Sequence, residues 1–156
     1  MRRLTVENYA LIERLDMELD PHLNIITGET GAGKSILLGA LGLLLGNKNE
    51  SGSLGDATRN CVIEGLFDVA GYGLEELFER NDMDYEEQTV IRRMISPSGK
   101  SRAFVNDVPV QLSALRELGA HLIDIHSQHQ NQVLADEAFR VRSLDMLAGS
   151  TDAVAE

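Results

Sequence analysis

Apolar and polar positions alternate over most of the first 27 residues. Leu4 and Val6 are separated by a polar neighbour, and the same period of two returns over 15–19, which is typical of half-buried β-strands. The segment 20–22, Asp-Pro-His, interrupts the second run before the apolar segment 23–27. The pattern predicts an antiparallel pair of strands followed by a third strand at 23–27.

Residues 34–46 are apolar on almost every side, which predicts a buried helix rather than a surface helix. Gly39 and Gly42 weaken its intrinsic helix propensity, and we expect both to allow close packing against a sheet. Gly46 is suited to end the helix. The next segment, 47–60, is polar and lacks periodicity, so it is predicted to be a surface loop.

Further along, the apolar spacing changes between the periods of strands and helices. Cys61, Ile63 and Phe67 share one face of an expected strand, which makes the single cysteine a buried, reduced thiol. The other expected elements are a short helix around Leu74, Leu77 and Phe78, a hairpin of 89–95 and 102–105 around the turn 96–100, and a helix carrying Leu112, Leu115 and Leu118 that ends at Gly119.

The last part of the chain begins with a short apolar run, 121–126, which predicts a strand that leads into the polar loop 127–132. A polar loop at the C-terminal end of a strand is where α/β folds place ligand chemistry. A helical pattern returns over 134–147, followed by a tail that we expect to fray. These features divide the chain into a lobe at 1–133 and a helical extension at 134–156.

At 156 residues, with 43% hydrophobic and 25% charged residues, the composition is that of one soluble globular domain. No apolar stretch approaches the roughly 18 residues of a membrane span, and the N-terminus lacks a signal-peptide pattern, so we expect a cytoplasmic protein. The formal net charge of -11 argues against a free-standing nucleic-acid binder, which would rely on neutralising phosphates. Basic residues cluster at Arg92-Arg93 and Lys100-Ser101-Arg102, which we interpret as a solvated hairpin.

The sequence Gly28-Glu29-Thr30-Gly31-Ala32-Gly33-Lys34-Ser35 fits the phosphate-loop pattern G-x-x-x-x-G-K-[ST] and lies between an expected strand and an expected helix. Its glycines allow positive φ angles and bring backbone N–H groups onto phosphate oxygens, while the helix directs its positive end at the same anion. Lys34 is expected to contact the β- and γ-phosphates, and Ser35 to contact Mg²⁺. The chain is therefore predicted to bind a nucleoside triphosphate.

The residues alone leave three interpretations of the chain open. If Asp124 is a second metal ligand, the chain is a self-contained P-loop phosphotransferase, with Arg92, Arg93 and Arg102 as its only clustered arginines. If Asp124 is structural, the amide oxygen of Gln128 is placed to contact Mg²⁺ or its water. The third function is that of a non-catalytic interaction module, whose thermal stability would not respond to nucleotide.

Several separate segments resemble a known family. Besides the phosphate loop and Ile36-Leu37-Leu38, they are Asn8-Tyr9-Ala10-Leu11-Ile12, Gly99-Lys100-Ser101-Arg102-Ala103-Phe104-Val105-Asn106 and Asp124-Ile125-His126-Ser127-Gln128-His129, in the family's order. Through them the chain resembles the RecN family of bacterial DNA repair proteins, which belongs to the SMC-like ATPases of the ABC class. The likeness extends over nearly the whole chain.

The resemblance implies an α/β P-loop NTPase fold of the ABC and SMC head type, with a mixed sheet and an antiparallel N-terminal portion. It implies that the chain is the ATP-binding N-terminal half of such a head. Gln128 would be the Q-loop glutamine, acting with Lys34 in catalysis and with Ser35 on Mg²⁺, and a coiled coil would follow 134–147. The signature motif, the Walker B acids and the switch histidine belong to a C-terminal head segment in this family, and we find none of them here.

The resemblance also implies partners. These are the C-terminal head segment of the same protein, a second copy on ATP binding, and DNA through the full-length protein in double-strand break repair and recombination, with no membrane. Because ATP is sandwiched between two subunits in ABC-class heads, this lobe alone is expected to bind ATP and hardly hydrolyse it. In the loop 47–60, the resemblance offers Arg59 as the counterpart of an arginine that faces nucleotide or DNA in related proteins.

Overall fold

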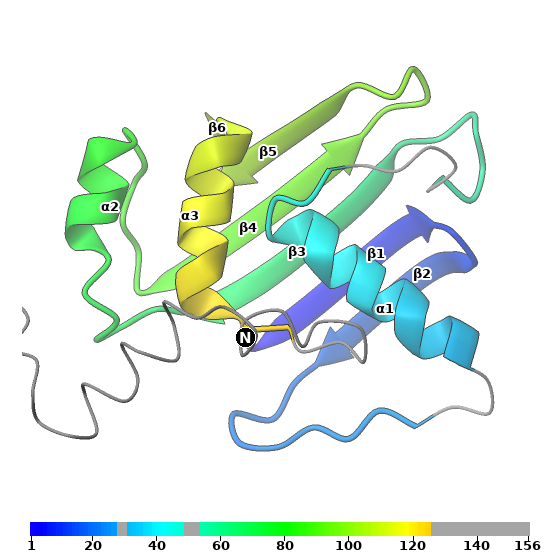
Figure 1. The fold of residues 1–156 in the computed structure, drawn as a ribbon, viewed down its shortest axis with the longest axis horizontal. Coiled ribbons are helices and arrows are strands. Elements are labelled where there is room, and N and C mark those ends of the chain that lie inside the picture. The colour runs from blue at the N-terminus through cyan, green and yellow to red at the C-terminus, as the bar shows by residue number, and fades with distance from the viewer. Residues whose placement is uncertain (28–30, 49–53, 126–156) are drawn as a thin grey trace, which may run out of the picture. The chain divides into compact units, whose positions relative to one another are not determined.

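A computed structural model of the chain describes residues 1–27, 31–48 and 54–125, whose arrangement is shown in Figure 1. Residues 1–124 form one compact unit, and nearly all of the second unit, 125–156, lies outside the described residues. The predicted helix at 134–147 and the polar loop with Gln128 fall in that undescribed part. The division of the chain at residue 133 stays a prediction.

The framework of the first unit is a six-stranded sheet in which all neighbouring strands are antiparallel. Its strands are β1 (Arg3–Tyr9), β2 (Ile12–Glu18), β3 (Cys61–Asp68), β4 (Gln88–Ile95), β5 (Ser101–Val105) and β6 (Val108–Val110), in the spatial order β2-β1-β3-β4-β5-β6. The first predicted hairpin is confirmed, because Leu4 opposes Met17 and Val6 opposes Leu15. The second is confirmed by the pairing of β4 with β5.

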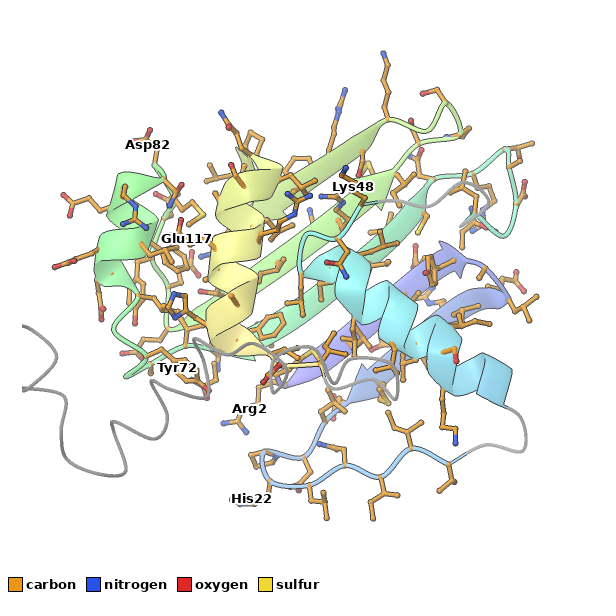
Figure 2. All side chains as sticks on the ribbon, viewed as in Figure 1. Arg2, His22, Lys48, Tyr72, Asp82 and Glu117 are labelled. Carbon is orange, nitrogen blue, oxygen red and sulfur yellow. The ribbon has the colours of Figure 1, made fainter. Side chains whose placement is uncertain are left out.

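Two helices cover one face of this sheet (Figure 1). α1 (Gly31–Leu44) contacts β3 and β4, and α3 (Leu112–Leu122) contacts β5. The short α2 (Glu75–Arg80) is joined to α3 by an ion pair between Arg80 and Glu117, the latter labelled on α3 in Figure 2. Beneath the helices, buried residues alternate with less buried ones along β1, β3 and β4, as predicted for Cys61, Ile63 and Phe67. The fully buried set includes Leu4, Val6, Cys61, Ile63, Ile91, Ile95, Val105, Leu115 and Leu118.

The helix boundaries differ from the prediction at two places. α1 begins at Gly31 instead of residue 34 and ends at Leu44, with Gly46 at φ +94° beyond it, as expected for a residue that ends a helix. α3 does not end at Gly119 but continues to Leu122. A Cβ at position 119 would lie 3.0 Å from the carbonyl oxygen of Leu45, so this glycine lets α3 pack closely against the chain that follows α1.

Two predicted strands are absent from the described structure. Segment 23–27 is irregular, and 121–125 comprises the end of α3 followed by coil. The apolar side chains of Leu23, Ile25 and Ile26 are 73%, 78% and 48% exposed. Apolar content indicates that a segment is suited to burial, but a strand also needs a neighbouring strand for its backbone hydrogen bonds, and neither segment pairs with the six-stranded sheet. The parallel pairing of a mixed sheet is therefore not seen among the described strands.

Strand β6 was not predicted. It follows β5 through Asn106 and Asp107, whose φ angles of 46° and 64° form a two-residue hairpin turn. The side chain of Asn106 accepts a hydrogen bond from Val90 N at 2.8 Å and donates one to the Asp84 carbonyl oxygen at 2.8 Å. The Asn-Asp pair between two valines was the available signal, but a three-residue strand gives little alternation to recognise.

The basic hairpin is not uniformly solvated, which corrects the interpretation from sequence. Arg92 lies on the face of the sheet away from the helices, where its guanidinium forms ion pairs with Glu64 at 2.6 Å and Asp107 at 2.8 Å. Arg93 points to the helix-covered face and is only 3% exposed. Because successive residues of a strand face opposite sides, two adjacent arginines in a strand of this sheet could not both face solvent on the uncovered face.

Asn8 joins the end of β1 to the loop that follows residue 53. It is 4% exposed and has a φ of 52°, a conformation that asparagine tolerates better than most residues. Its Nδ2 donates to the carbonyl oxygens of Asp56 at 2.9 Å and Arg59 at 3.0 Å, and its Oδ1 accepts the N–H of Asp56 at 2.6 Å. One side chain therefore anchors a loop that is distant in sequence.

We predict that Asn8→Ala lowers the free energy of unfolding by about 2–4 kcal/mol. The substitution removes these hydrogen bonds, and it places alanine, whose side chain cannot form a local hydrogen bond, at a positive φ. Asn8→Gly should lose about 1 kcal/mol less, since glycine adopts positive φ without strain. Urea unfolding of both variants measures the two contributions. Wild-type stability in both would contradict the anchoring role.

Burial should make the thiol of Cys61 unreactive in the folded chain. The side chain is fully buried in β3, and desolvation raises its pKa to about 11. At pH 8 the thiolate fraction is then on the order of one in a thousand, so labelling by a disulfide reagent should be slow. Addition of guanidinium chloride should release one reactive thiol. Rapid labelling of the native chain would show that β3 opens or that the thiol is accessible.

Candidate phosphate-binding site

The phosphate-loop sequence is located at the N-terminus of α1. Gly31 to Ser35 are the first residues of this 14-residue helix, while 28–30 lie outside the described part of the chain. The first backbone N–H groups of a helix have no intrahelical partner, and the helix dipole places partial positive charge at the same end. No acidic residue occurs in the first turn. This end of α1 is therefore suited to receive an anion.

Gly33 has a different conformation from the one expected, but its surroundings fit a ligand site. It lies within α1 and does not have a positive φ, so the backbone argument made from sequence is wrong for this glycine. A Cβ built at position 33 would meet no atom within 4 Å. Packing inside the protein therefore gives no reason for a glycine here, whereas the close approach of a ligand to the backbone does.

Lys34 and Ser35 are both exposed beside Gly33. The ammonium group of Lys34 forms no ion pair with any carboxylate of the described residues. Together, the two side chains offer a point charge and a hydroxyl oxygen at a helix N-terminus. That combination matches the donors that phosphate oxygens require and one oxygen ligand for a hard cation.

The other two predicted site residues belong to the part of the chain that follows α3. Asp124 is exposed in the coil that follows α3 and does not end a strand, and Gln128 lies outside the described residues. Among residues 1–27, 31–48 and 54–125, no cluster of three His, Cys, Asp or Glu side chains could hold a metal ion. Of the predicted Mg²⁺ ligands, Ser35 is therefore the one that the described residues place at the start of α1.

The segment 20–27, which precedes the motif, exposes apolar side chains, and hydrogen bonds join its first residues to one another. Asp20 N donates to Asn24 Oδ1 at 2.8 Å, Asn24 Nδ2 donates to the Asp20 carbonyl oxygen at 2.8 Å, and His22 N donates to Asp20 Oδ1 at 2.8 Å. Figure 2 shows His22 on this segment, away from the sheet. Sequence reasoning missed that the adjoining residues 23–27 remain uncovered in the described structure.

Other predicted features have limited roles in the described structure. Arg59 is exposed, and it contributes its carbonyl oxygen to the Asn8 anchor. Within the described part of the chain, no helix has the length and apolar character that crossing a bilayer requires.

The AAA domain family model matches residues 3–142. The chain is also similar to the DNA repair protein RecN of Vibrio cholerae, at 36% identity over 153 residues, and to that of Bacillus subtilis, at 38% identity over 152 residues. These matches cover 97% and 96% of this chain but 28% and 26% of the relatives. The chain thus spans about a quarter of the length of the curated relatives it matches.

Solved structures of SMC proteins have a similar fold. An SMC ATPase structure from work on ATP-driven dimerization and DNA-stimulated activation matches with a TM-score of 0.62 at 18% identity, covering 92% of this chain and 95% of that chain. The SMC head domain from Thermotoga maritima matches with a TM-score of 0.60 at 17% identity, covering 87% of this chain and 50% of that chain. At these identities the likeness establishes the fold alone. It confirms the α/β P-loop fold of the SMC head type.

Proposed function

This chain belongs to the AAA domain family, and we propose that it is the ATP-binding half of an SMC-like ATPase head that acts in DNA double-strand break repair and recombination. The proposal rests mainly on the properties of the N-terminus of α1. There Gly33 leaves open space, Lys34 is exposed and has no ion pair with the residues that the structure describes, and the first turn has no carboxylate. Similarity to RecN DNA repair proteins over nearly the whole chain supports the role in repair.

In this proposal the residues 28–35 hold the phosphates of ATP. Lys34 neutralises charge on the β- and γ-phosphates, and the backbone N–H groups at the start of α1 donate to phosphate oxygens. Ser35 supplies one oxygen ligand to Mg²⁺, and Gln128 supplies a second through its amide oxygen. When bound, Mg²⁺ supplies charge neutralisation on the phosphates during transfer to water.

We further propose that the site is incomplete in this chain. The apolar side chains of 23–27 are exposed immediately before the phosphate loop, where a P-loop fold requires a buried strand. The C-terminal head segment of the same protein would cover these side chains by pairing with 23–27. It would also supply the Walker B acids, which were not found in this chain. The chain's short coverage of its RecN relatives supports such a second segment.

The remaining partners follow from the same composite arrangement. ATP would hold two copies of the completed head together, and the ATP-driven dimerization described for the similar SMC ATPase supports this step. DNA would be contacted by the full-length protein in the cytoplasm. The net charge of -11 makes this lobe by itself a poor DNA ligand, because its phosphate neutralisation would be weak.

A self-contained phosphotransferase is the less favoured function. Such an enzyme needs a metal-binding carboxylate at the end of a strand and free arginines over the phosphates. Asp124 follows a helix, Arg92 is held by Glu64 and Asp107, and Arg93 is buried. Of the three arginines suggested by sequence, only Arg102 is exposed without an ion pair among the described residues, and one arginine does not make the clustered lid that such an enzyme needs.

The chain should bind ATP in the presence of Mg²⁺, and Lys34→Ala should weaken the binding by about 10- to 100-fold, the effect of losing a charge-assisted contact. Isothermal titration calorimetry measures both affinities. The matched control is Lys48→Ala, because Lys48 is exposed after α1 but outside the motif (Figure 2), and its loss should leave the affinity unchanged. Equal affinity of the Lys34→Ala variant and the wild type would exclude the site.

Gly33→Ala separates the folding role of this residue from its binding role. Since an added Cβ meets no atom, the free energy of unfolding should stay the same or rise by up to about 1 kcal/mol, as alanine favours helix. The same Cβ should lower ATP affinity by about tenfold or more, because it fills the space for the phosphates.

The contrasting variant is Gly39→Ala in the same helix, where a Cβ would lie 2.6 Å from the Tyr9 hydroxyl oxygen. It should cost about 1–3 kcal/mol of stability while the folded molecules retain ATP binding. Unfolding and titration curves of both variants check the pair. Unchanged ATP affinity in Gly33→Ala would show that the open space at position 33 is not used by the ligand.

A further inference from the structure

A cavity lies at the corner where β5, β6 and the start of α3 meet. Its volume is about 540 Å³, and its lining includes Arg93 from β4, Ser101 and Ala103 from β5, and Leu112 at the start of α3. The short β6 pairs only with 103–105, so the beginning of β5 lacks a neighbour on that side and forms part of the wall. This volume is in the range of small-ligand sites.

The cavity contains a buried charge that the described protein does not neutralise. Arg93 is 3% exposed, and its Nε has no hydrogen-bond partner. The guanidinium forms no ion pair with any residue in the described part of the chain. Burial of an unpaired charge is costly, and proteins normally compensate it with an opposite charge. None of the acidic side chains in the described part of the chain lies beside Arg93 as a partner.

The surroundings add positive rather than negative potential. Burial lowers the pKa of the Arg93 guanidinium, and the positive charge of Arg116 on α3 lowers it further. Arg116 donates its Nε hydrogen to the Gly46 carbonyl oxygen at 2.7 Å and has no carboxylate partner among described residues. Arg102 is the other charged residue of the lining, and no acidic side chain of the described chain belongs to it.

The start of α3 provides a second kind of donor to the same cavity. Gln111 at the N-cap makes no side-chain hydrogen bond to the helix, and the first turn has no acidic residue. The N–H groups of this 11-residue helix are therefore not capped by a side chain where Leu112 lines the cavity. A guanidinium fork together with helix N–H groups is the donor set that binds phosphate oxygens.

We propose that this cavity is a second anion site, which binds a phosphoryl group, either of inorganic phosphate or of a small phosphomonoester, with Arg93 as its principal ligand. The site uses β4, β5 and α3, whereas the proposed ATP site uses the N-terminus of α1. It therefore stands independently of the proposed ATPase function. Its occupation would remove the unpaired charge from the core and fix α3 to the edge of the sheet.

The test uses the whole 156-residue chain carrying Lys34→Ala, so that the start of α1 no longer contributes phosphate binding. At constant ionic strength, inorganic phosphate at ten times its dissociation constant should raise Tm by about 3–6 °C. Adding Arg93→Met should abolish the shift, and in phosphate-free buffer it should raise Tm, because it removes an unpaired buried charge. The control is Arg92→Met in the same background, since the paired, opposite-facing Arg92 should leave the phosphate shift intact.

A second measurement locates the ligand without altering Arg93. In ¹⁵N-labelled Lys34→Ala chain, phosphate should move the amide signals of Ser101 and of 112–115 and leave those of β1 and β2 in place. Phenyl phosphate acting at lower concentration would assign the site to phosphomonoesters, and inorganic phosphate acting alone would assign it to the free ion. An equal Tm shift from malonate, a shift that persists in Arg93→Met, or unmoved signals at 101 and 112–115 would each overturn the proposal.

Discussion

The packing of α1 against β3 and β4 is the contact on which the phosphate site depends. Ala40, Leu43 and Leu44 are buried in this contact, while the beginning of the helix reaches beyond it and keeps Lys34 exposed. A helix N-terminus binds an anion well only when its N–H groups are already fixed in direction, because ordering them during binding would cost conformational entropy. The antiparallel sheet therefore serves as a rigid support whose apolar face holds one end of α1.

Much of this support could be predicted from sequence because it is encoded locally. Period-two alternation identified the buried face of β3, and the apolar run after the phosphate loop identified α1, although the helix begins at Gly31 and not at residue 34. The errors arose where a distant contact decides the structure. Gly119 was taken as a stop, but it is a packing residue because Leu45 approaches it, and Arg93 was taken as solvated although the strand register turns it toward the core. The local sequence contains neither fact.

Segment 23–27 and Arg93 are two features that the described part of the lobe leaves uncompensated, and they differ in kind. Among the described residues, the first is apolar surface without cover, and the second is a charge without a counter-charge. Natural domains rarely leave either uncompensated, since exposed apolar patches promote association and buried unpaired charges destabilise the fold. We propose that a second protein segment covers the apolar surface and that a bound anion pairs with the arginine. In both cases a binding partner would complete the lobe.

The central claim is that this lobe holds ATP but lacks the groups needed to cleave it. The most direct measurement is to incubate the purified chain with labelled ATP and Mg²⁺, isolate the protein-bound nucleotide, and determine how much of it remains ATP. We expect bound nucleotide that stays ATP over many hours. Steady conversion to ADP by the chain alone, abolished by Lys34→Ala, would contradict this expectation and would mean that a complete active site is already present.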